Sequence, residues 1–91
     1  MTIETWTPAF EDILRSHLPW CKPDTAIAPE APLTDLGLDS LKTVRLLVAI
    51  EDAYALAFPD ELLAANTFAT AATLWSGIQA AATHCGVEIP A

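Results

Sequence analysis

Four prolines interrupt the middle of this 91-residue chain, at positions 19, 23, 29 and 32. Proline in a helix interior removes a backbone hydrogen bond and clashes with the preceding turn. The segment from residue 19 to residue 39 therefore cannot form a regular helix, although apolar residues at helical spacing appear on both sides of it. Ordered loops of this length are usually functional or packed down by their own side chains. We expect a long first loop that divides a helical chain, anchored by Trp20, Ile27, Leu33 and Leu36.

Helix signals flank this loop, and the rest of the chain shows no strand alternation and no internal repeat. Thr7, Asp39 and Thr70 stand where helix N-caps are expected, and Gly86 stands where the last helix should stop. Pro59 begins a shorter helical pattern with two acidic residues behind it. The pattern predicts an all-α four-helix bundle with a long first loop and a short third helix. The expected helices span residues 7–18, 40–56, 59–65 and 71–83.

Length and composition are those of one small domain. Hydrophobic residues make up 53% of the chain and glycine occurs only three times, which favours a packed helical protein over a disordered one. A chain of this size buries a modest core, so we do not expect a large enclosed active site. We expect a single domain over residues 1–91, with its core over about residues 5–83 and a flexible C-terminal tail over residues 84–91.

Charge and hydropathy exclude two classes of partner. Twelve acidic and four basic residues give a net charge of −8, whereas nucleic acid phosphates demand a basic surface. The longest apolar stretch, Leu46–Phe58, contains Glu51 and Asp52 and is too short to cross a bilayer. The N-terminus lacks the basic region and the apolar run of a signal peptide. We therefore expect a cytoplasmic protein that binds neither nucleic acid nor membranes.

The clearest candidate for chemistry is Ser40, which opens the second expected helix. Asp39 already fills the cap position, so the hydroxyl is not needed as a cap, and Gly37 allows a turn just before the helix. A serine at this position can also be a plain helix-start residue, since serine is common there. A catalytic serine needs a base and an oxyanion hole, yet neither His17 nor His84 belongs to a recognisable pattern, and no Gly-x-Ser-x-Gly elbow is present. We expect no catalysis by this chain alone.

The second expected helix carries two apolar stripes rather than one. Thr43, Leu46, Leu47, Ile50 and Tyr54 fall in one arc of the helical wheel and form an ordinary core stripe. A second group, Leu41, Val44 and Val48, lies on the other side of Ser40. We interpret this second stripe as an exposed docking surface, because so small a bundle has little room to bury both. The alternative is that one stripe packs on the first helix and the other on the long loop.

The remaining candidates favour plain structural roles. Cys21 and Cys85 are isolated, and we expect both to be free thiols. These cysteines do not have metal-ligand spacing with the two histidines, so we expect no metal site. The three tryptophans, Trp6, Trp20 and Trp75, are expected to be core or loop anchors.

The string Leu36-Gly37-Leu38-Asp39-Ser40-Leu41 resembles the attachment motif of acyl and peptidyl carrier proteins, and the resemblance extends from the first expected helix to the last. Carrier proteins are four-helix bundles with a long first loop and a short third helix. The resemblance implies that Ser40 carries a covalent 4′-phosphopantetheine arm taken from coenzyme A. It also implies that Asp39 helps a phosphopantetheinyl transferase and its metal ion to approach the hydroxyl.

The resemblance further implies a set of partner enzymes. The expected partners are the phosphopantetheinyl transferase, an adenylation or acyltransferase enzyme that loads the arm, and downstream condensation or tailoring enzymes. Leu41, Val44 and Val48 match the apolar contact positions of the family's second helix. Fatty-acid carriers typically have acidic residues at the second and fifth positions after the serine, where this chain has Lys42 and Arg45. The five expected partner-binding residues are thus Leu41, Lys42, Val44, Arg45 and Val48.

Two residues near the attachment motif indicate which branch of the family the chain resembles. Arg45 is typical of peptidyl carriers, whereas Asp39 is typical of acyl carriers. We expect a discrete, non-catalytic peptidyl carrier of nonribosomal peptide or hybrid polyketide biosynthesis. The alternatives are an acyl carrier of polyketide or fatty-acid synthesis and, from another class, an unmodified helical interaction domain. A small enzyme is a further rival, which the missing nucleophile–base pair disfavours.

Overall fold

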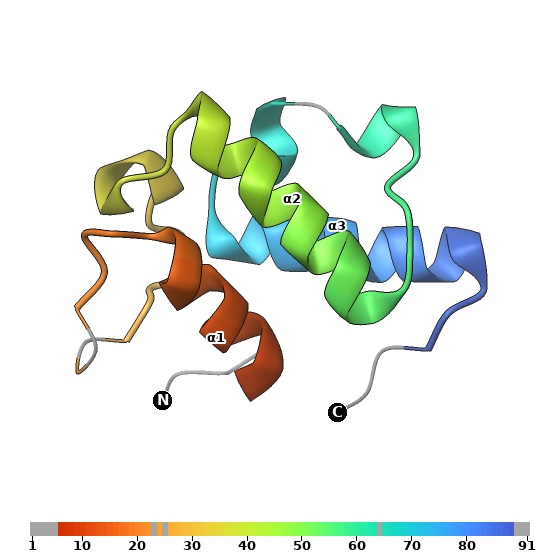
Figure 1. Cartoon of the computed structure of the whole chain (residues 1–91), viewed down its shortest axis with the longest axis horizontal. Helices are drawn as coiled ribbons and strands as arrows, with labels where there is room; N and C mark the ends of the chain where they lie inside the picture. The colour runs from red at the N-terminus through yellow and green to blue at the C-terminus, as the bar shows by residue number, and fades with distance from the viewer. Residues whose placement is uncertain (1–5, 23, 25, 64, 89–91) are drawn as a thin grey trace.

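Side-chain caps start all three α-helices of the computed structural model, which describes residues 6–22, 24, 26–63 and 65–88. The helices are α1 (Pro8–His17), α2 (Ser40–Tyr54) and α3 (Ala71–Cys85), joined by short 3-10 turns. The expected caps Thr7, Asp39 and Thr70 are confirmed, because each side chain accepts a backbone hydrogen bond from the first turn of its helix. Figure 1 shows α1 beside α2, with α3 running behind them. The described part of the chain is all-helical and contains no strand, in agreement with the expected fold class.

The core lies where the three helices meet. Phe10 and Leu14 of α1, Leu46 and Ile50 of α2, and Leu74 of α3 are completely buried. The expected core stripe of α2 is thereby confirmed at its centre. The Phe10 and Trp75 rings pack with their centroids 5.0 Å apart.

The long first loop is fixed to the start of α3 by backbone hydrogen bonds. Leu33 N–H donates to the Ala69 carbonyl at 2.9 Å, and Ala72 N–H donates to the Pro29 carbonyl at 3.1 Å. Leu33 is fully buried and starts a 3-10 turn, η1 (Leu33–Leu36). Ile27 is also buried, so two of the expected loop anchors are confirmed, and a third, Leu36, is half-buried against the core. This long segment is therefore an ordered part of the bundle that delivers the chain to the start of α2.

Within the expected short third helix, residues 59–65, the structure has only a 3-10 turn, η2 (Asp60–Leu62), and a second 3-10 turn, η3 (Ala65–Phe68), begins where that helix was expected to end. After η2 the backbone of Leu63 leaves helical geometry, at φ −93° and ψ 23°. A helix this short is marginal by itself, since few hydrogen bonds offset the cost of ordering its first turn. Leu62 and Phe68 pack against the core, and this packing fixes the two turns although they do not join into one helix.

Two helix ends differ from the expected ends. α2 stops at Tyr54 rather than at residue 56, because Ala55 adopts a left-handed conformation at φ 54°. Phe58 N–H then donates to the Glu51 carboxylate at 2.9 Å. α3 continues to Cys85, so residues 84 and 85 lie in the helix and not in the expected tail.

Beyond α3 the chain still contacts the bundle. Gly86 ends the helix in the left-handed region at φ 70°, as expected. Val87 N–H donates to the Ala82 carbonyl at 2.8 Å, and its side chain packs against the core. The remainder of the expected tail, residues 89–91, and the first residue of the expected core range lie outside the described residues.

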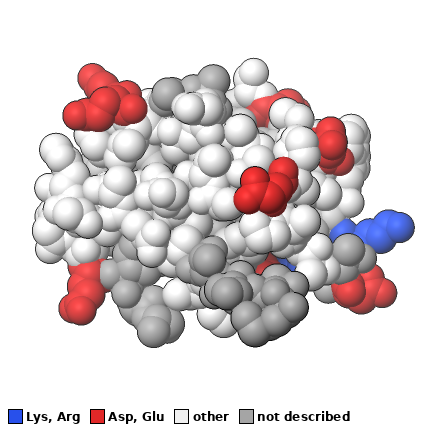
Figure 2. Space-filling model, turned by 180° about the vertical axis from the view of Figure 1, so that it is seen from behind, with Lys and Arg blue, Asp and Glu red and all other residues white. Residues whose placement is uncertain are grey.

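Figure 2 shows the face opposite to the view of Figure 1. Acidic side chains are spread around this face, and basic side chains show mainly at one edge. No described helix has both the length and the apolar character needed to cross a membrane.

Candidate functional site

The start of α2 is built around the Asp39 carboxylate. One carboxylate oxygen accepts the Lys42 backbone N–H at 2.8 Å, and the other accepts the Lys42 ammonium at 3.1 Å. The backbone hydrogen bond from Lys42 is the main reason that the pKa of Asp39 lies below its ordinary value, and the contact with the Lys42 side chain adds to it. The helix therefore begins with an ionised, correctly placed cap.

Ser40 is the first residue of α2, and its side chain is exposed. None of the described residues makes a side-chain hydrogen bond with its hydroxyl. The cap is supplied by Asp39, and Thr43 Oγ1 donates to the Asp39 carbonyl at 2.7 Å, so neither interaction uses Ser40. The hydroxyl is therefore available to an external reagent, and an anion attached to it would be favoured by the positive end of the helix dipole.

The turn that precedes Ser40 is rigid and needs glycine. Gly37 lies in the left-handed region at φ 101°, and the turn expected at this residue is present. A Cβ atom at this position would approach Pro19 Cγ to 2.7 Å and Trp20 Cδ2 to 3.3 Å. The Leu36 carbonyl accepts the Trp20 N–H at 3.0 Å. The two ends of the first loop are thus packed together just before the candidate serine.

The second apolar stripe of α2 is exposed, as expected. Leu41, Val44 and Val48 keep 60%, 57% and 58% of their surface accessible. Arg45 between them is also exposed, and Lys42, which pairs with Asp39, keeps 39% of its side-chain surface accessible. Neighbouring exposed apolar side chains on one helix face are characteristic of a docking surface rather than of a core stripe.

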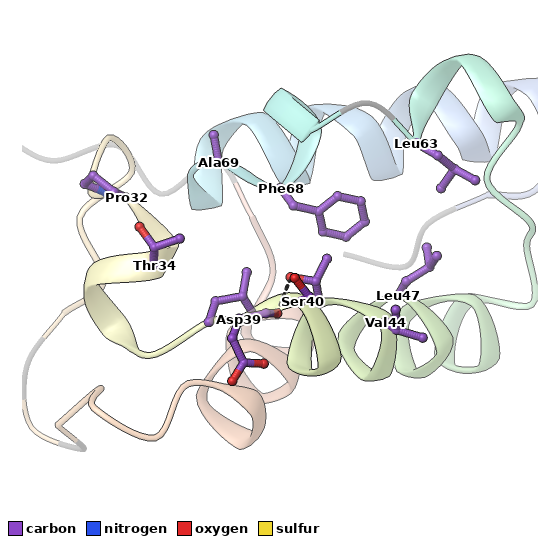
Figure 3. Close-up of a pocket in the computed structure, with 11 residues that line it drawn as sticks. Pro32, Thr34, Asp39, Ser40, Val44, Leu47, Leu63, Phe68 and Ala69 are labelled. Atoms are coloured by element: carbon purple, nitrogen blue, oxygen red, sulfur yellow. Dashed lines mark hydrogen bonds between the residues drawn. The ribbon is translucent and has the colours of Figure 1, made fainter.

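An open pocket of about 800 Å³ lies beside Ser40. Figure 3 shows α2 on one side of this pocket, contributing Val44 and Leu47, and Leu63 and Phe68 on the opposite side. The Ser40 side chain lies along this pocket, whereas the Asp39 carboxylate points away from it. The lining is mostly apolar, so the candidate serine lies between an exposed apolar helix face and an apolar pocket.

Sequence reasoning placed one tryptophan wrongly. Trp6 and Trp75 are buried, with 7% and 5% of their surface accessible, as expected of core anchors. Trp20 is 68% exposed, so it is not an anchor of the loop interior. A single aromatic residue in a loop has no periodic pattern, so the local sequence gives no signal that this side chain is exposed.

The other candidates remain structural. Cys21 and Cys85 are both free thiols, as expected. His17 Nδ1 lies 2.9 Å from the Ile13 carbonyl, within its own helix. In the described ranges, no three metal-ligating side chains gather in one place.

Comparison with known proteins identifies a family pattern. The family model described as phosphopantetheine attachment site matches residues 10–75. An aminoacyl carrier protein from Agrobacterium fabrum is 44% identical over 48 residues, which are 53% of this chain and 58% of that relative. The aligned stretch thus spans little more than half the length of this relative.

Two solved structures resemble the fold. One contains an engineered Bradyrhizobium japonicum glycine:[carrier protein] ligase complexed with a carrier protein from Agrobacterium tumefaciens and AMP. It matches with a TM-score of 0.68 and 33% identity over 77% of this chain and 93% of that chain. The other contains the Bradyrhizobium japonicum ligase with glycylated carrier protein, at a TM-score of 0.59 and 22% identity, over 76% and 97% of the two chains. At that identity the second match shows the fold alone.

The start of α2 fits a phosphopantetheine group. The group needs a hydroxyl that is exposed, held in place and free of other hydrogen bonds, and Ser40 meets these conditions among the described residues. Its phosphate would lie at the N-terminus of a 15-residue helix, where exposed backbone N–H groups favour an anion.

Proposed function

We infer that this chain, which belongs to the phosphopantetheine-attachment-site family, is a carrier protein for acyl or aminoacyl groups on a covalent 4′-phosphopantetheine arm, and we propose that Ser40 holds this arm. The observation that carries the proposal is the exposed Ser40 at the capped start of α2. The arm supplies a thiol that holds its cargo as a thioester. The folded domain positions the arm and raises the effective concentration of the cargo at each partner enzyme. In this proposal the chain does no chemistry of its own.

The cargo that we propose is an amino acid. Support comes from the aminoacyl carrier protein that resembles this chain, and from the glycine:[carrier protein] ligase found with the structurally similar carrier. We propose that an adenylating ligase loads the arm, and that condensation or tailoring enzymes of nonribosomal peptide or hybrid polyketide biosynthesis then receive the cargo. We propose that the carrier acts as a monomer, since it must visit several partners in turn, and that it does so in the cytoplasm.

We further propose that partner enzymes dock on the exposed face of α2, through Leu41, Lys42, Val44, Arg45 and Val48. The three apolar side chains offer contact area, and the two cations select against basic partner surfaces by like-charge repulsion. Lys42 pairs with the Asp39 carboxylate at 3.1 Å, which offsets its charge, whereas Arg45 has no ion pair among the described residues. Arg45 is therefore the stronger determinant of charge preference.

Mass spectrometry tests the attachment. The apo protein is incubated with coenzyme A and a broad-specificity phosphopantetheinyl transferase, with Ser40→Ala alongside. We expect the parent to gain one phosphopantetheine group and the variant to gain none. Modification of the Ser40→Ala variant, or no modification of the folded parent by two different transferases, would overturn the proposal.

Aminoacyl loading is tested on the modified protein. The holo carrier is incubated with ATP, a panel of amino acids and a glycine:[carrier protein] ligase. We expect an aminoacyl thioester that hydroxylamine removes. Loading by a malonyl- or fatty-acyl-transferring enzyme, with no aminoacyl product, would assign the chain to the acyl branch instead.

The charge preference is tested with Lys42→Glu combined with Arg45→Glu. We expect the double variant to have a several-fold lower KM with fatty-acid enzymes whose carrier-binding surface is basic, and a higher KM with the aminoacyl ligase. Both effects should weaken as salt rises from 20 to 300 mM, because exposed charges are screened over about 8–10 Å at physiological ionic strength. Unchanged kinetics with both enzyme sets would contradict the assignment.

A further inference from the structure

Trp20 is the most exposed of the large apolar side chains described, with 68% of its surface accessible. The other two tryptophans are buried in the core, whereas the indole of Trp20 is not covered by the fold. Tryptophan is enriched among the residues that dominate binding energy at protein interfaces, because it offers a large rigid surface at low entropic cost. An exposed indole in a domain this small therefore needs an explanation outside the fold.

Trp20 is held against the turn that delivers Ser40. Its backbone N–H donates to the Leu36 carbonyl at 3.0 Å, and its indole ring lies 3.3 Å from where a Cβ atom of Gly37 would be. Beside it is a hollow of about 330 Å³ with apolar side chains, Ile27 and Leu36 among them, in its lining. The indole and this hollow together offer a partner both a protruding ring and a recess.

The distance from Trp20 to Ser40 has an upper limit set by the chain. Gly37 precedes Ser40 by three residues, which span at most about 11 Å when fully extended. The indole lies 3.3 Å from where a Cβ atom of Gly37 would be. Adding this distance and one Cα–Cβ bond places the edge of the ring within about 16 Å of the Ser40 backbone. A standard interface buries about 800 Å² on each partner, which corresponds to a disc of about 16 Å radius. A partner centred on Ser40 therefore reaches Trp20.

One partner has to be centred there. In phosphopantetheinylation the Ser40 oxygen forms a bond to the phosphorus next to pantetheine in coenzyme A, and the phosphoanhydride bond to that phosphorus breaks. The products are the Ser40 phosphodiester and 3′,5′-bisphosphoadenosine, and the hydroxyl proton passes to a base of the transferase. Because this reaction takes place at the side chain itself, the transferase must cover the surroundings of Ser40. An enzyme that acts at the distal thiol of the arm is not constrained in this way.

We propose that Trp20 is a docking anchor for the phosphopantetheinyl transferase, which grips the carrier on the first loop as well as on α2. The inference rests on the proposed attachment at Ser40. In this proposal the first loop contacts the transferase through Trp20, in addition to the contact made by the exposed face of α2.

Fluorine NMR tests the contact directly. The apo carrier is labelled with 5-fluorotryptophan, and Trp20→Phe assigns its resonance among those of the three tryptophans. Unlabelled transferase is then added without coenzyme A. We expect the Trp20 resonance to shift and to lose its H₂O/D₂O isotope shift, while the resonances of Trp6 and Trp75 stay in place.

Steady-state kinetics supply the second readout. We expect Trp20→Ala to raise the KM of the transferase for the apo carrier at least tenfold with little change in kcat, and Trp20→Phe to recover part of the loss. Gln79→Ala, an exposed change on α3, is the matched control. Circular dichroism and the melting temperature verify that each variant is folded.

The outcomes separate this inference from the proposed attachment. If the parent is modified at Ser40 but neither the Trp20 resonance nor the KM responds, the docking role is wrong and the attachment stands. If the folded parent is not modified at Ser40, the attachment itself fails. A Trp20 response to an aminoacyl ligase and none to the transferase would overturn the choice of partner.

Discussion

Replacing Gly37 by alanine should destabilise this protein more than the same replacement at Gly86. Both glycines have left-handed backbones, at φ 101° and 70°, where a Cβ atom costs about 1–2 kcal/mol. At Gly37 the new Cβ would also lie 2.7 Å from Pro19 Cγ, whereas at Gly86 nothing lies within 4 Å. Overpacking of this kind costs a further about 1–3 kcal/mol. We therefore expect losses of about 2–5 kcal/mol for Gly37→Ala and about 1–2 kcal/mol for Gly86→Ala.

The two variants form a matched pair. The entropy that alanine removes from the unfolded chain is the same at both positions and cancels in their difference. Urea unfolding at 25 °C gives the two free energies, and the slopes must agree with that of the parent for the comparison to hold. A chain of 91 residues typically has only about 5–14 kcal/mol of stability, so the Gly37 variant should also melt well below the parent.

A third variant checks the cause. Pro19→Ala removes the ring atoms that the new Cβ would meet, so in the Gly37→Ala background it should recover part of the loss, with a coupling of about 0.5–3 kcal/mol. Equal losses at the two glycines, or no coupling with Pro19, would refute the argument that this turn is held by close packing. The strain would then be purely conformational.

Three further outcomes follow from the described contacts. The pKa of Asp39 is lower in the folded chain than its ordinary 3.8. Its contribution to the free energy of unfolding is therefore fully present above pH 3.8 and is lost as pH falls through the folded-state pKa. Asp39→Asn should flatten this dependence in urea midpoints measured from pH 2.5 to 6. Glu11, whose pKa is lowered from 4.5 chiefly by the hydrogen bond from Trp6, should show the same direction, with Trp6 fluorescence changing below pH 4.5 in the parent and not in Glu11→Gln. Gly77→Ala would bring a Cβ to 2.8 Å from Thr67 Cγ2, so thermal melts should show it to be destabilising, and more so with Thr67 present than in a Thr67→Ser background.

The start of α2 could be predicted from sequence almost residue by residue. The cap at Asp39 and the free hydroxyl of Ser40 depend on neighbours within a few positions. Helical periodicity separated Leu41, Val44 and Val48 from the core stripe, and the small size of the bundle favoured their exposure over burial against the first loop. Local rules were sufficient because each feature is formed within one or two helical turns.

The same reasoning failed where burial depended on distant segments. Trp20 was expected inside the loop and is exposed, while Ile27 and Leu33 of the same loop are buried. Nothing in the local sequence separates these three apolar residues. Each is buried or exposed according to whether it contacts the helices when the loop folds back. Helical periodicity does not describe these contacts.

The sequence by itself determined the helix starts, the proline-rich first loop, the position of Ser40 and the apolar face beside it, because these depend on short-range hydrogen bonding and on helical spacing. Only the tertiary structure decided that a 3-10 turn replaces the expected third helix, that a pocket lies beside Ser40 and that Trp20 is exposed next to the turn before Ser40. These features arise where segments far apart in the chain meet. The 2.9 Å hydrogen bond from Leu33 to Ala69 is one such meeting, and no local rule specifies it.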